Sequence, residues 1–338
     1  MLEADRLRTA LKERTEVQAR CPACKKDKAR VLRIGIREDP DWPVFACLNC
    51  RLRFIEPKHT DLRDYYANQY RKFHSDNQPW DGGEEEHVET ADDRFQIQYA
   101  GGKESAKVFM QGDKQVEGVP EGAAVLEVGC SAGGFLAHLD GKYDLFATEW
   151  TTEDREFVQK AGVPCEDGDI LDVFPGQKFT AIVARQVLEH QLDPVEFLSH
   201  CRERLIGGGW LFLEIPNANN ALAAVYQIEK YRDWWYCEPH ITYWEPETLA
   251  QLLGAVGFEA RVMPLQMFGM LHSFNWLAKK VPTPKADAVA MMQPVNTNHP
   301  LGPALNRIWG QFDRAYRIQM ETLSCTDYLR SFCRRREI

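Results

Sequence analysis

The chain has 338 residues, of which 44% are hydrophobic and 27% charged, and its formal net charge is -9. This composition is typical of a globular protein, and the length predicts one domain with appendages. No apolar run approaches the roughly 20 residues of a membrane helix. The first 17 residues are too charged for a secretory signal, so we expect a cytoplasmic protein. The acidic balance disfavours a nucleic-acid partner.

The N-terminal segment contains a predicted metal site. Residues 1–18 have the spacing of a short amphipathic helix, and 31–36, 42–47 and 51–56 read as short strands. Two Cys-x-x-Cys pairs, separated by 22 residues, supply four thiolates for a structural zinc ion: Cys21, Cys24, Cys47 and Cys50. Such a zinc ribbon has little core, so metal binding would contribute on the order of 10 kcal/mol to its folding.

A tyrosine-rich helix is expected over residues 61–74, packing the ribbon against the next part of the chain. The acidic, glycine-containing stretch 78–89 follows it and is the best candidate for a linker. Thr90 is positioned to cap a helix over 91–110. We therefore expect three parts, comprising residues 1–77, 78–265 and 266–338.

Residues 125–134, VLEVGCSAGG, predict a buried strand that ends in a tight turn, where a ligand can approach the backbone. A dinucleotide-binding loop would have glycine where Ser131 stands, and a pyrophosphate would gain nothing from Glu127. The acid instead favours a cofactor with an amino group and a positive sulfonium. The loop residues predicted to hold it are Glu127, Gly129, Ser131 and Gly133.

Strand and helix patterns alternate after this turn, with strands at 143–150, 179–184 and 210–217. Helices are expected from 135, at 152–161, and from 193 up to the glycines at 207–209. This alternation predicts an α/β fold with a Rossmann-like, doubly wound parallel sheet.

Side chains at the ends of these strands suit an adenosine group. Glu149 could accept hydrogen bonds from both ribose hydroxyls, and Trp150 could cover the adenine. Asp169 could accept from the adenine amine while Ile170 packs on the ring, with Asp167 as the alternative acid. Gln186 is close enough in the sequence pattern to contact the cofactor.

The glycine-rich stretch resembles that of class I S-adenosylmethionine-dependent methyltransferases. The runs QVLEHQLDP and PHITYWEPETLAQLLGAVGF, the paired cysteines and YYANQY look more narrowly like methyltransferases of sugar-nucleotide and surface-polysaccharide pathways. The resemblance covers roughly residues 20–265. It implies S-adenosylmethionine as cofactor, a small sugar-containing acceptor, and a helix at 91–110 that shields the cofactor pocket.

The candidate general base is His240, which by resemblance matches the base of sugar C-methyltransferases. The sequence departs from that family in having Thr180 where an acid is usual, and Glu-Pro-His at 238–240 in place of His-Glu-His. Tyr243 could orient the acceptor or share the proton transfer. Glu189 and His190 form a rival pair that could orient a base, bind a metal, or simply cap a helix and pack.

The rest of the chain is less specific. Aromatic residues over 226–244 could stack on a sugar ring or pack as a lid. A helix at 247–256 and a strand at 258–263 precede an irregular proline-rich stretch at 281–303. A final helix over 304–333 could cover the pocket or form a homodimer contact.

We therefore expect a methyltransferase that acts on oxygen or carbon of a small acceptor. Two alternatives remain: an RNA methyltransferase that uses the ribbon for recognition, and a non-catalytic binding protein.

Overall fold

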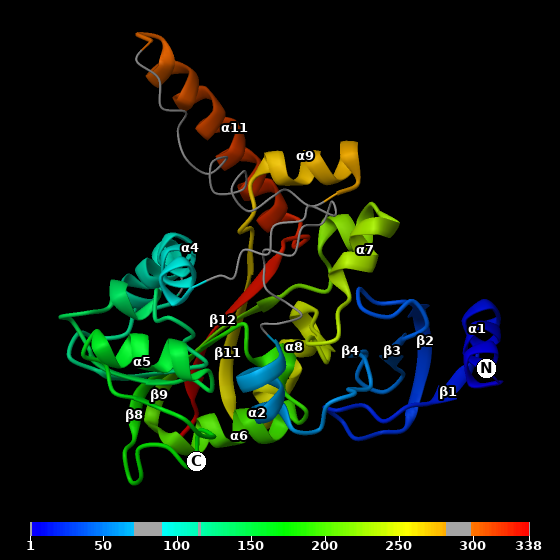
Figure 1. The fold of residues 1–338 in the computed structure, drawn as a ribbon, viewed down its shortest axis with the longest axis horizontal. Coiled ribbons are helices and arrows are strands. Elements are labelled where there is room, and N and C mark those ends of the chain that lie inside the picture. Colours follow the sequence, from blue (N-terminus) through cyan, green and yellow to red (C-terminus); the bar gives the residue numbers. More distant parts are fainter. Residues whose placement is uncertain (1, 71–89, 114–115, 282–298, 338) are drawn as a thin grey trace.

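The structure is a computed structural model that describes residues 2–70, 90–113, 116–281 and 299–337. The predicted linker at 78–89 and most of the loop at 281–303 lie outside these residues. The described chain forms a five-stranded and a seven-stranded sheet. In Figure 1 the N-terminal sheet lies at one end of the long axis and the strands of the larger sheet run through the rest of the molecule.

The N-terminal unit begins with α1 (Leu2–Glu13) and continues as a small antiparallel sheet. Its strands are β1 (Glu16–Gln18), β2 (Lys28–Ile34), β3 (Pro43–Cys47) and β4 (Arg53–Phe54). A fifth strand, β10 (Thr242–Tyr243), comes from much later in the sequence and pairs with β4. The ribbon is therefore continuous with the segment that follows His240.

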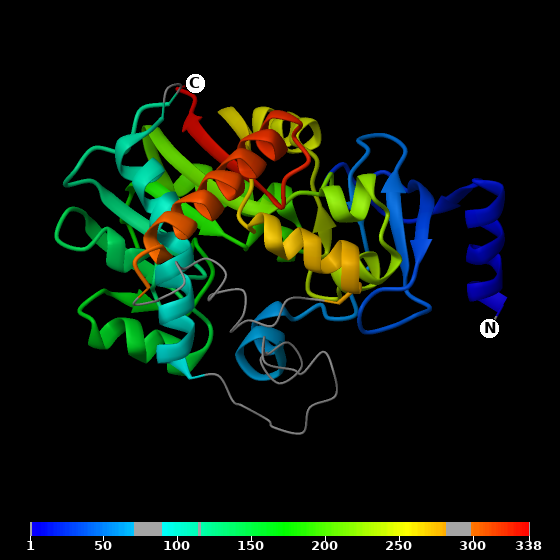
Figure 2. The same cartoon turned by 90° about the horizontal axis from the view of Figure 1, so that it is seen from above.

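The predicted helix after the ribbon begins at Leu62 and is helical to Tyr70, and its last predicted residues, 71–74, lie outside the described residues. Asp61 caps α2 (Leu62–Asp64), accepting a hydrogen bond from the Asp64 amide at 3.0 Å, and a π-helical turn, η1 (Tyr65–Gln69), follows directly. In Figure 2 this segment, in light blue, lies between the two sheets rather than on the outer face of the ribbon.

The seven-stranded sheet has the order β11-β12-β9-β8-β5-β6-β7. Strands β5 to β9 are parallel and β12 is antiparallel to both of its neighbours, which confirms the predicted Rossmann-like fold. Its strands are β5 (Ala124–Val128), β6 (Asp144–Thr148), β7 (Cys165–Glu166), β8 (Phe179–Arg185), β9 (Leu205–Pro216), β11 (Phe258–Leu265) and β12 (Tyr328–Arg335). The centre of β8 is buried on both faces, as expected for a strand between two layers of helices.

The described helices between residues 91 and 279 are α4 (Ala91–Gln111), α5 (Thr152–Lys160), α6 (Pro194–Arg204), α7 (Glu229–Trp235), α8 (Pro246–Val256) and α9 (Met270–Lys279), with short turns η3 (Leu188–His190) and η4 (Ala221–Val225). Helices α4, α5, α6 and α8 follow the predicted positions closely, whereas α7 and α9 were not predicted. Thr90 caps α4 as predicted, in a reciprocal capping box with Asp93.

Two details of the sheet region differ from the predictions. The expected helix after the glycine-rich loop is only a 3₁₀ turn, η2 (Leu136–His138), because α4 lies where a longer helix would pack. A Cβ atom on Gly134 would stand 2.5 Å from the Tyr99 amide nitrogen of α4. The glycines at 207–209 do not end a helix, since α6 stops at Arg204 and these residues belong to β9.

The prediction of a helix through residue 333 is wrong. Helix α11 (Gly302–Thr322) ends before Ser324, whose φ of +54° is incompatible with a continuing helix, and residues 328–335 form β12. The last part of the chain is therefore not only a loop and helical extension, because it supplies a strand inside the main sheet.

Helix α11 projects from the body of the molecule in Figure 1. Its contact with α9 includes a 2.5 Å hydrogen bond between the hydroxyls of Ser273 and Tyr316. Several of its apolar side chains are exposed, namely Leu305, Ile308, Trp309 and Phe312. The homodimer stays a prediction. Among the described residues, no helix combines the length and apolar character required to cross a membrane.

Candidate active site

A cavity of about 1250 Å³ opens at the carboxyl ends of β5, β6 and β8. This edge of a parallel sheet is where α/β folds bind ligands. Helix α4 covers it through Arg94, Ile97 and Gln98, as predicted for the leading helix. Nine predicted site residues share its lining: Glu127, Gly129, Ser131, Glu149, Trp150, Asp169, Ile170, Gln186 and His240.

Two glycines of the loop are required for different structural reasons. Gly129 has a φ of +64°, and a Cβ atom there would meet Val187 Cγ2 at 3.1 Å. Gly133 has a φ of +77°, and its Cβ atom would meet Val158 Cγ2 at 2.9 Å. Gly133 is not among the lining residues, so its absent side chain permits the turn to pack on α5 rather than leaving room for a ligand.

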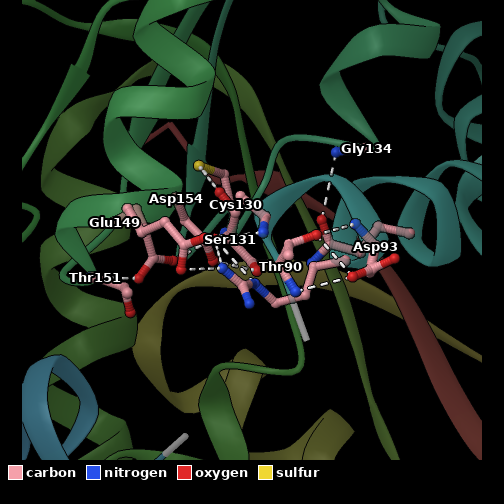
Figure 3. A network of polar contacts seen from close by, with 12 residues as sticks. Thr90, Asp93, Cys130, Ser131, Gly134, Glu149, Thr151 and Asp154 are labelled. Atoms are coloured by element: carbon pink, nitrogen blue, oxygen red, sulfur yellow. Dashed lines mark hydrogen bonds and ion pairs between the residues drawn. The ribbon is translucent and has the colours of Figure 1, made fainter. Parts of the chain in front are cut away.

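Ser131 takes a left-handed conformation, with a φ of +47°, and a polar network holds it there (Figure 3). Its amide donates to Glu149 Oε2 at 2.9 Å and its hydroxyl donates to Asp154 Oδ2 at 2.8 Å. Asp154 is fully buried and accepts a 2.9 Å hydrogen bond from Arg94 Nε. Glu149 also accepts from the Thr151 amide at 2.8 Å. The network thus joins the loop, the end of β6 and helix α4.

Glu127 is a buried acid in the wall of the cavity, only 3% exposed. Its Oε2 atom has no hydrogen-bond partner among the described residues. Burial raises its pKa to about 8, an effect that Arg185 opposes and that Glu214 and Glu149 reinforce. A ligand ammonium group would satisfy this carboxylate. The residues present therefore fit a cationic, amino-containing cofactor such as S-adenosylmethionine.

A second buried acid, Glu214, supports the cavity from β9. Arg185 Nε donates to its Oε2 at 2.7 Å, and Arg330 Nε donates to its Oε1 at 2.8 Å. Ser105 of α4 also donates to Oε1, at 2.7 Å. Burial by itself would raise the pKa of Glu214, but Arg185 and Arg330 outweigh it and lower the pKa. These hydrogen bonds connect α4, β8, β9 and β12 beside the part of the cavity that Glu127 lines.

His190 and His240 also line the cavity, with ring centroids 4.9 Å apart. His190 Nδ1 is 2.7 Å from the Tyr66 hydroxyl and 2.8 Å from the Pro239 carbonyl oxygen. The Ile241 amide donates to the Glu189 carbonyl at 2.8 Å. The loop that carries His240 is thus bonded to the η3 turn on both sides of the histidine.

Tyr66 was not predicted as a site residue. The sequence signal was the tyrosine-rich segment, which was expected to pack between the ribbon and the rest of the chain. In the structure Tyr66 and Tyr70 line the cavity, and the Tyr66 ring lies 5.9 Å from that of Trp150. The N-terminal segment therefore forms part of the cavity wall.

Tyr243 lies away from the cavity, contrary to expectation. It is 2% exposed, and its hydroxyl donates to the Cys237 carbonyl at 3.1 Å and accepts from the Cys237 amide at 3.0 Å. This placement argues against the predicted role in orienting the acceptor. Most rings of the 226–244 segment likewise pack in cores, where Tyr231 lies 4.9 Å from Trp276, so the packing alternative accounts for them, whereas Tyr226 is exposed.

The four predicted metal-ligating cysteines come together between β1–β2 and β3–β4. Their sulfur atoms all lie within 4.8 Å of one another, with Cys21–Cys50 at 3.6 Å and Cys24–Cys47 at 3.4 Å. Tetrahedral zinc with Zn–S bonds of about 2.3 Å places its sulfurs about 3.8 Å apart. The cluster therefore fits a structural zinc ion and leaves no ligand position for chemistry.

Comparison with known proteins gives a family match over part of the larger sheet. Residues 111–261 match the model of a methyltransferase-domain family. Curated protein sequences give no significant match.

Among solved structures, the chain is similar to an S-adenosylmethionine-dependent methyltransferase of Archaeoglobus fulgidus, with 16% identity, a TM-score of 0.43, and coverage of 71% of this chain and 94% of that one. It is also similar to the magnesium protoporphyrin IX methyltransferase of Synechocystis with bound S-adenosylhomocysteine, with 15% identity, a TM-score of 0.42, and coverage of 60% and 91%. The family model and the strand order together identify residues 111–261 as a methyltransferase domain with a Rossmann-like fold.

Proposed function

We propose that this protein methylates an oxygen or carbon atom of a small, sugar-containing acceptor, with His240 as general base. One observation carries the proposal: a single cavity is lined both by the predicted cofactor residues and by His190 and His240, and we call the lining around these two groups the cofactor side and the acceptor side. Its volume of about 1250 Å³ exceeds the roughly 300–1,000 Å³ typical of a site for one small ligand. The cavity therefore has room for a methyl donor and an acceptor together.

On the cofactor side, Glu127 pairs with the amino group and Glu149 accepts from the ribose hydroxyls. Asp169 and Ile170 hold the adenine, with Trp150 over it and Gln186 nearby. The choice of Asp169 over Asp167 is supported by the cavity lining, which includes Asp169 and not Asp167.

The chemistry is an in-line displacement. S-adenosylmethionine, when bound, supplies an electrophilic methyl group on its sulfonium. The cavity walls hold the acceptor in line with that group, and such alignment can lower the barrier by roughly 7–11 kcal/mol. His240 accepts the proton that the acceptor atom loses as its new bond to carbon forms. A positioned base typically adds roughly 10²- to 10⁴-fold to the rate.

The sugar-containing acceptor is supported by the resemblance of the sequence motifs and by the lining of the acceptor side. Tyr66 and Tyr70 offer ring faces for the apolar face of a sugar, and Asp193 and His200 offer polar groups for its hydroxyls. The zinc ion is proposed to be architectural, since it holds the ribbon whose next segment carries Tyr66 into the cavity.

The test is methyl transfer from labelled S-adenosylmethionine to a panel of nucleotide sugars, glycans and RNA. For His240→Ala we expect transfer to fall about 10²- to 10⁴-fold while calorimetry shows unchanged cofactor binding. The control is His299→Ala, at an exposed histidine outside the cavity. Normal turnover of His240→Ala would exclude the base, and transfer to RNA alone would exclude the sugar acceptor.

A further inference from the structure

We propose that Glu189, His190 and His240 form a second metal site, for a divalent cation with the ligand preferences of Zn²⁺. Each offers one ligand atom, and these atoms all lie within 4.8 Å of one another. Two of the three residues line the acceptor side of the cavity. The site shares no residue with the cysteine cluster.

The hydrogen bonds of His190 assign its tautomer. Its Nδ1 lies 2.8 Å from the Pro239 carbonyl oxygen, which can only accept, so Nδ1 carries the proton in the neutral ring. The Tyr66 hydroxyl, 2.7 Å from the same nitrogen, then accepts as well. Nε2 is left with a lone pair, and it faces Glu189 Oε1 at 3.8 Å. Metal-ligating histidines are commonly oriented in this way, through a carbonyl or hydroxyl on the other nitrogen.

Glu189 needs a positive partner. The residue is fully buried, and neither carboxylate oxygen receives a hydrogen bond from the described residues. A buried carboxylate is strongly unfavourable unless it is paired with a charge or ligates a metal. In the neutral ring, His190 Nε2 presents a lone pair to Glu189 Oε1 at 3.8 Å rather than a proton. A cation held between the carboxylate and the two imidazoles satisfies all three groups at once.

The donor set and its rigidity suit zinc. Two imidazole nitrogens and one carboxylate oxygen occupy three positions of a tetrahedron and leave the fourth for a ligand from the cavity. With bonds of about 2.0–2.2 Å, the ligand atoms would lie about 3.4 Å apart. The 3.8 Å between Glu189 Oε1 and His190 Nε2 has to close by a few tenths of an ångström, and the pairs involving His240, which lie within 4.8 Å, by at most about 1.4 Å. The bond from the Ile241 amide to the Glu189 carbonyl holds the two segments of the site together.

Metal binding at this site has a functional consequence that rests on the proposed function. A nitrogen of His240 that ligates a metal cannot also accept a proton from the acceptor. Occupancy of the site and action of His240 as base therefore exclude each other. Added metal should inhibit methyl transfer without weakening cofactor binding.

The test uses the whole protein with its cysteine cluster loaded with zinc. Titration with Co²⁺ should show one further equivalent by calorimetry, with the visible absorption of tetrahedral cobalt. Glu189→Gln should lose this equivalent, and Tyr66→Phe should bind Co²⁺ about 10-fold more weakly because the support of His190 is reduced. Glu247→Gln, at an exposed acid outside the cavity, is the matched control and should bind as the wild type does.

Cofactor binding by each variant shows that it is folded. The absence of a further equivalent in the wild type, or its persistence in Glu189→Gln, would overturn the metal site. If one further equivalent binds and methyl transfer falls, both proposals are supported. If it binds and methyl transfer rises, the metal site stands and the role of His240 as free base is overturned.

Discussion

The two sides of the cavity are built in different ways. On the cofactor side, Glu127, Glu149 and Gln186 all stand at or just beyond the ends of adjacent parallel strands of one sheet. On the acceptor side, Tyr66, His190 and His240 come from segments far apart in the sequence. The ends of adjacent strands, supported by α4, form the first side, whereas the second also depends on long-range contacts between the N-terminal unit and the larger sheet.

Several long-range contacts join the ribbon to the segments around His240. β4 pairs with β10, the Ile55 amide donates to the Ile241 carbonyl at 3.0 Å, and Arg53 Nη1 donates to the Ala218 carbonyl at 2.8 Å. The loop with His240 thus lies between the ribbon on one side and the η3 turn on the other. The ribbon therefore directly contacts the loop that carries His240.

The largest effect is expected when the ribbon is unfolded. Cys47→Ser removes one zinc ligand, and because metal binding contributes on the order of 10 kcal/mol to such a unit, the N-terminal sheet should lose its structure. Methyl transfer should then be abolished, while binding of S-adenosylhomocysteine in calorimetry changes only a few-fold. Cys325→Ser, away from the cluster, serves as control. Retained turnover without bound zinc would contradict the dependence of the acceptor side on the ribbon.

An intermediate effect is expected on the cofactor side from Arg94→Met. The substitution leaves Asp154 buried without its charge partner, which typically costs about 3–5 kcal/mol of the free energy of unfolding. The Ser131 loop should lose its support, and cofactor affinity should fall. Denaturant unfolding and calorimetry measure the two quantities.

Asp154→Asn in the same chain should restore part of the stability lost in Arg94→Met, because it removes the unpaired charge. Equal stability of the single and double variants would mean that the ion pair does not support the loop.

The smallest expected effect is the pH dependence of the free energy of unfolding and of cofactor affinity that titration of Glu127 produces. Its pKa is about 8 in the folded chain and about 4.3 in an unfolded one, so between these values the folded state binds more protons. The free energy of unfolding should therefore fall as the pH rises through this window. Cofactor binding requires the ionised acid, so affinity should rise by up to about tenfold per pH unit below pH 8.

Calorimetry with S-adenosylhomocysteine between pH 6 and 8 measures this slope. Glu127→Gln should flatten it, since the amide does not titrate. A slope that is unchanged in the variant would remove Glu127 from the amino-group site.

The difference between residues at strand ends and residues that distant segments bring together also explains which features could be predicted from the sequence. The strand–turn–helix alternation, the Thr90 cap, the cysteine spacing and the residues at strand ends are local patterns, and the structure has them where expected. Tyr66 and Tyr243 were misjudged because their places depend on how distant segments meet. The reduction of the first helix to η2 depends on the position of α4 in the same way.

The C-terminal strand shows a second kind of difficulty. Residues 328–335 follow a long amphipathic helix, and buried apolar positions near a helix can be read as its continuation. Only pairing with β9 and β11 identifies them as a strand.

The position of β12 also sets the order in which the sheet can assemble during synthesis. β11 touches the rest of the sheet through β12, yet β12 begins about 60 residues after β11 ends at Leu265. At about 5–20 residues per second, a ribosome needs roughly 3–12 s to make the intervening chain. During this interval one edge of β9 has no neighbouring strand, and β11 is unpaired. The nascent protein is therefore most exposed to aggregation just before its last strand emerges.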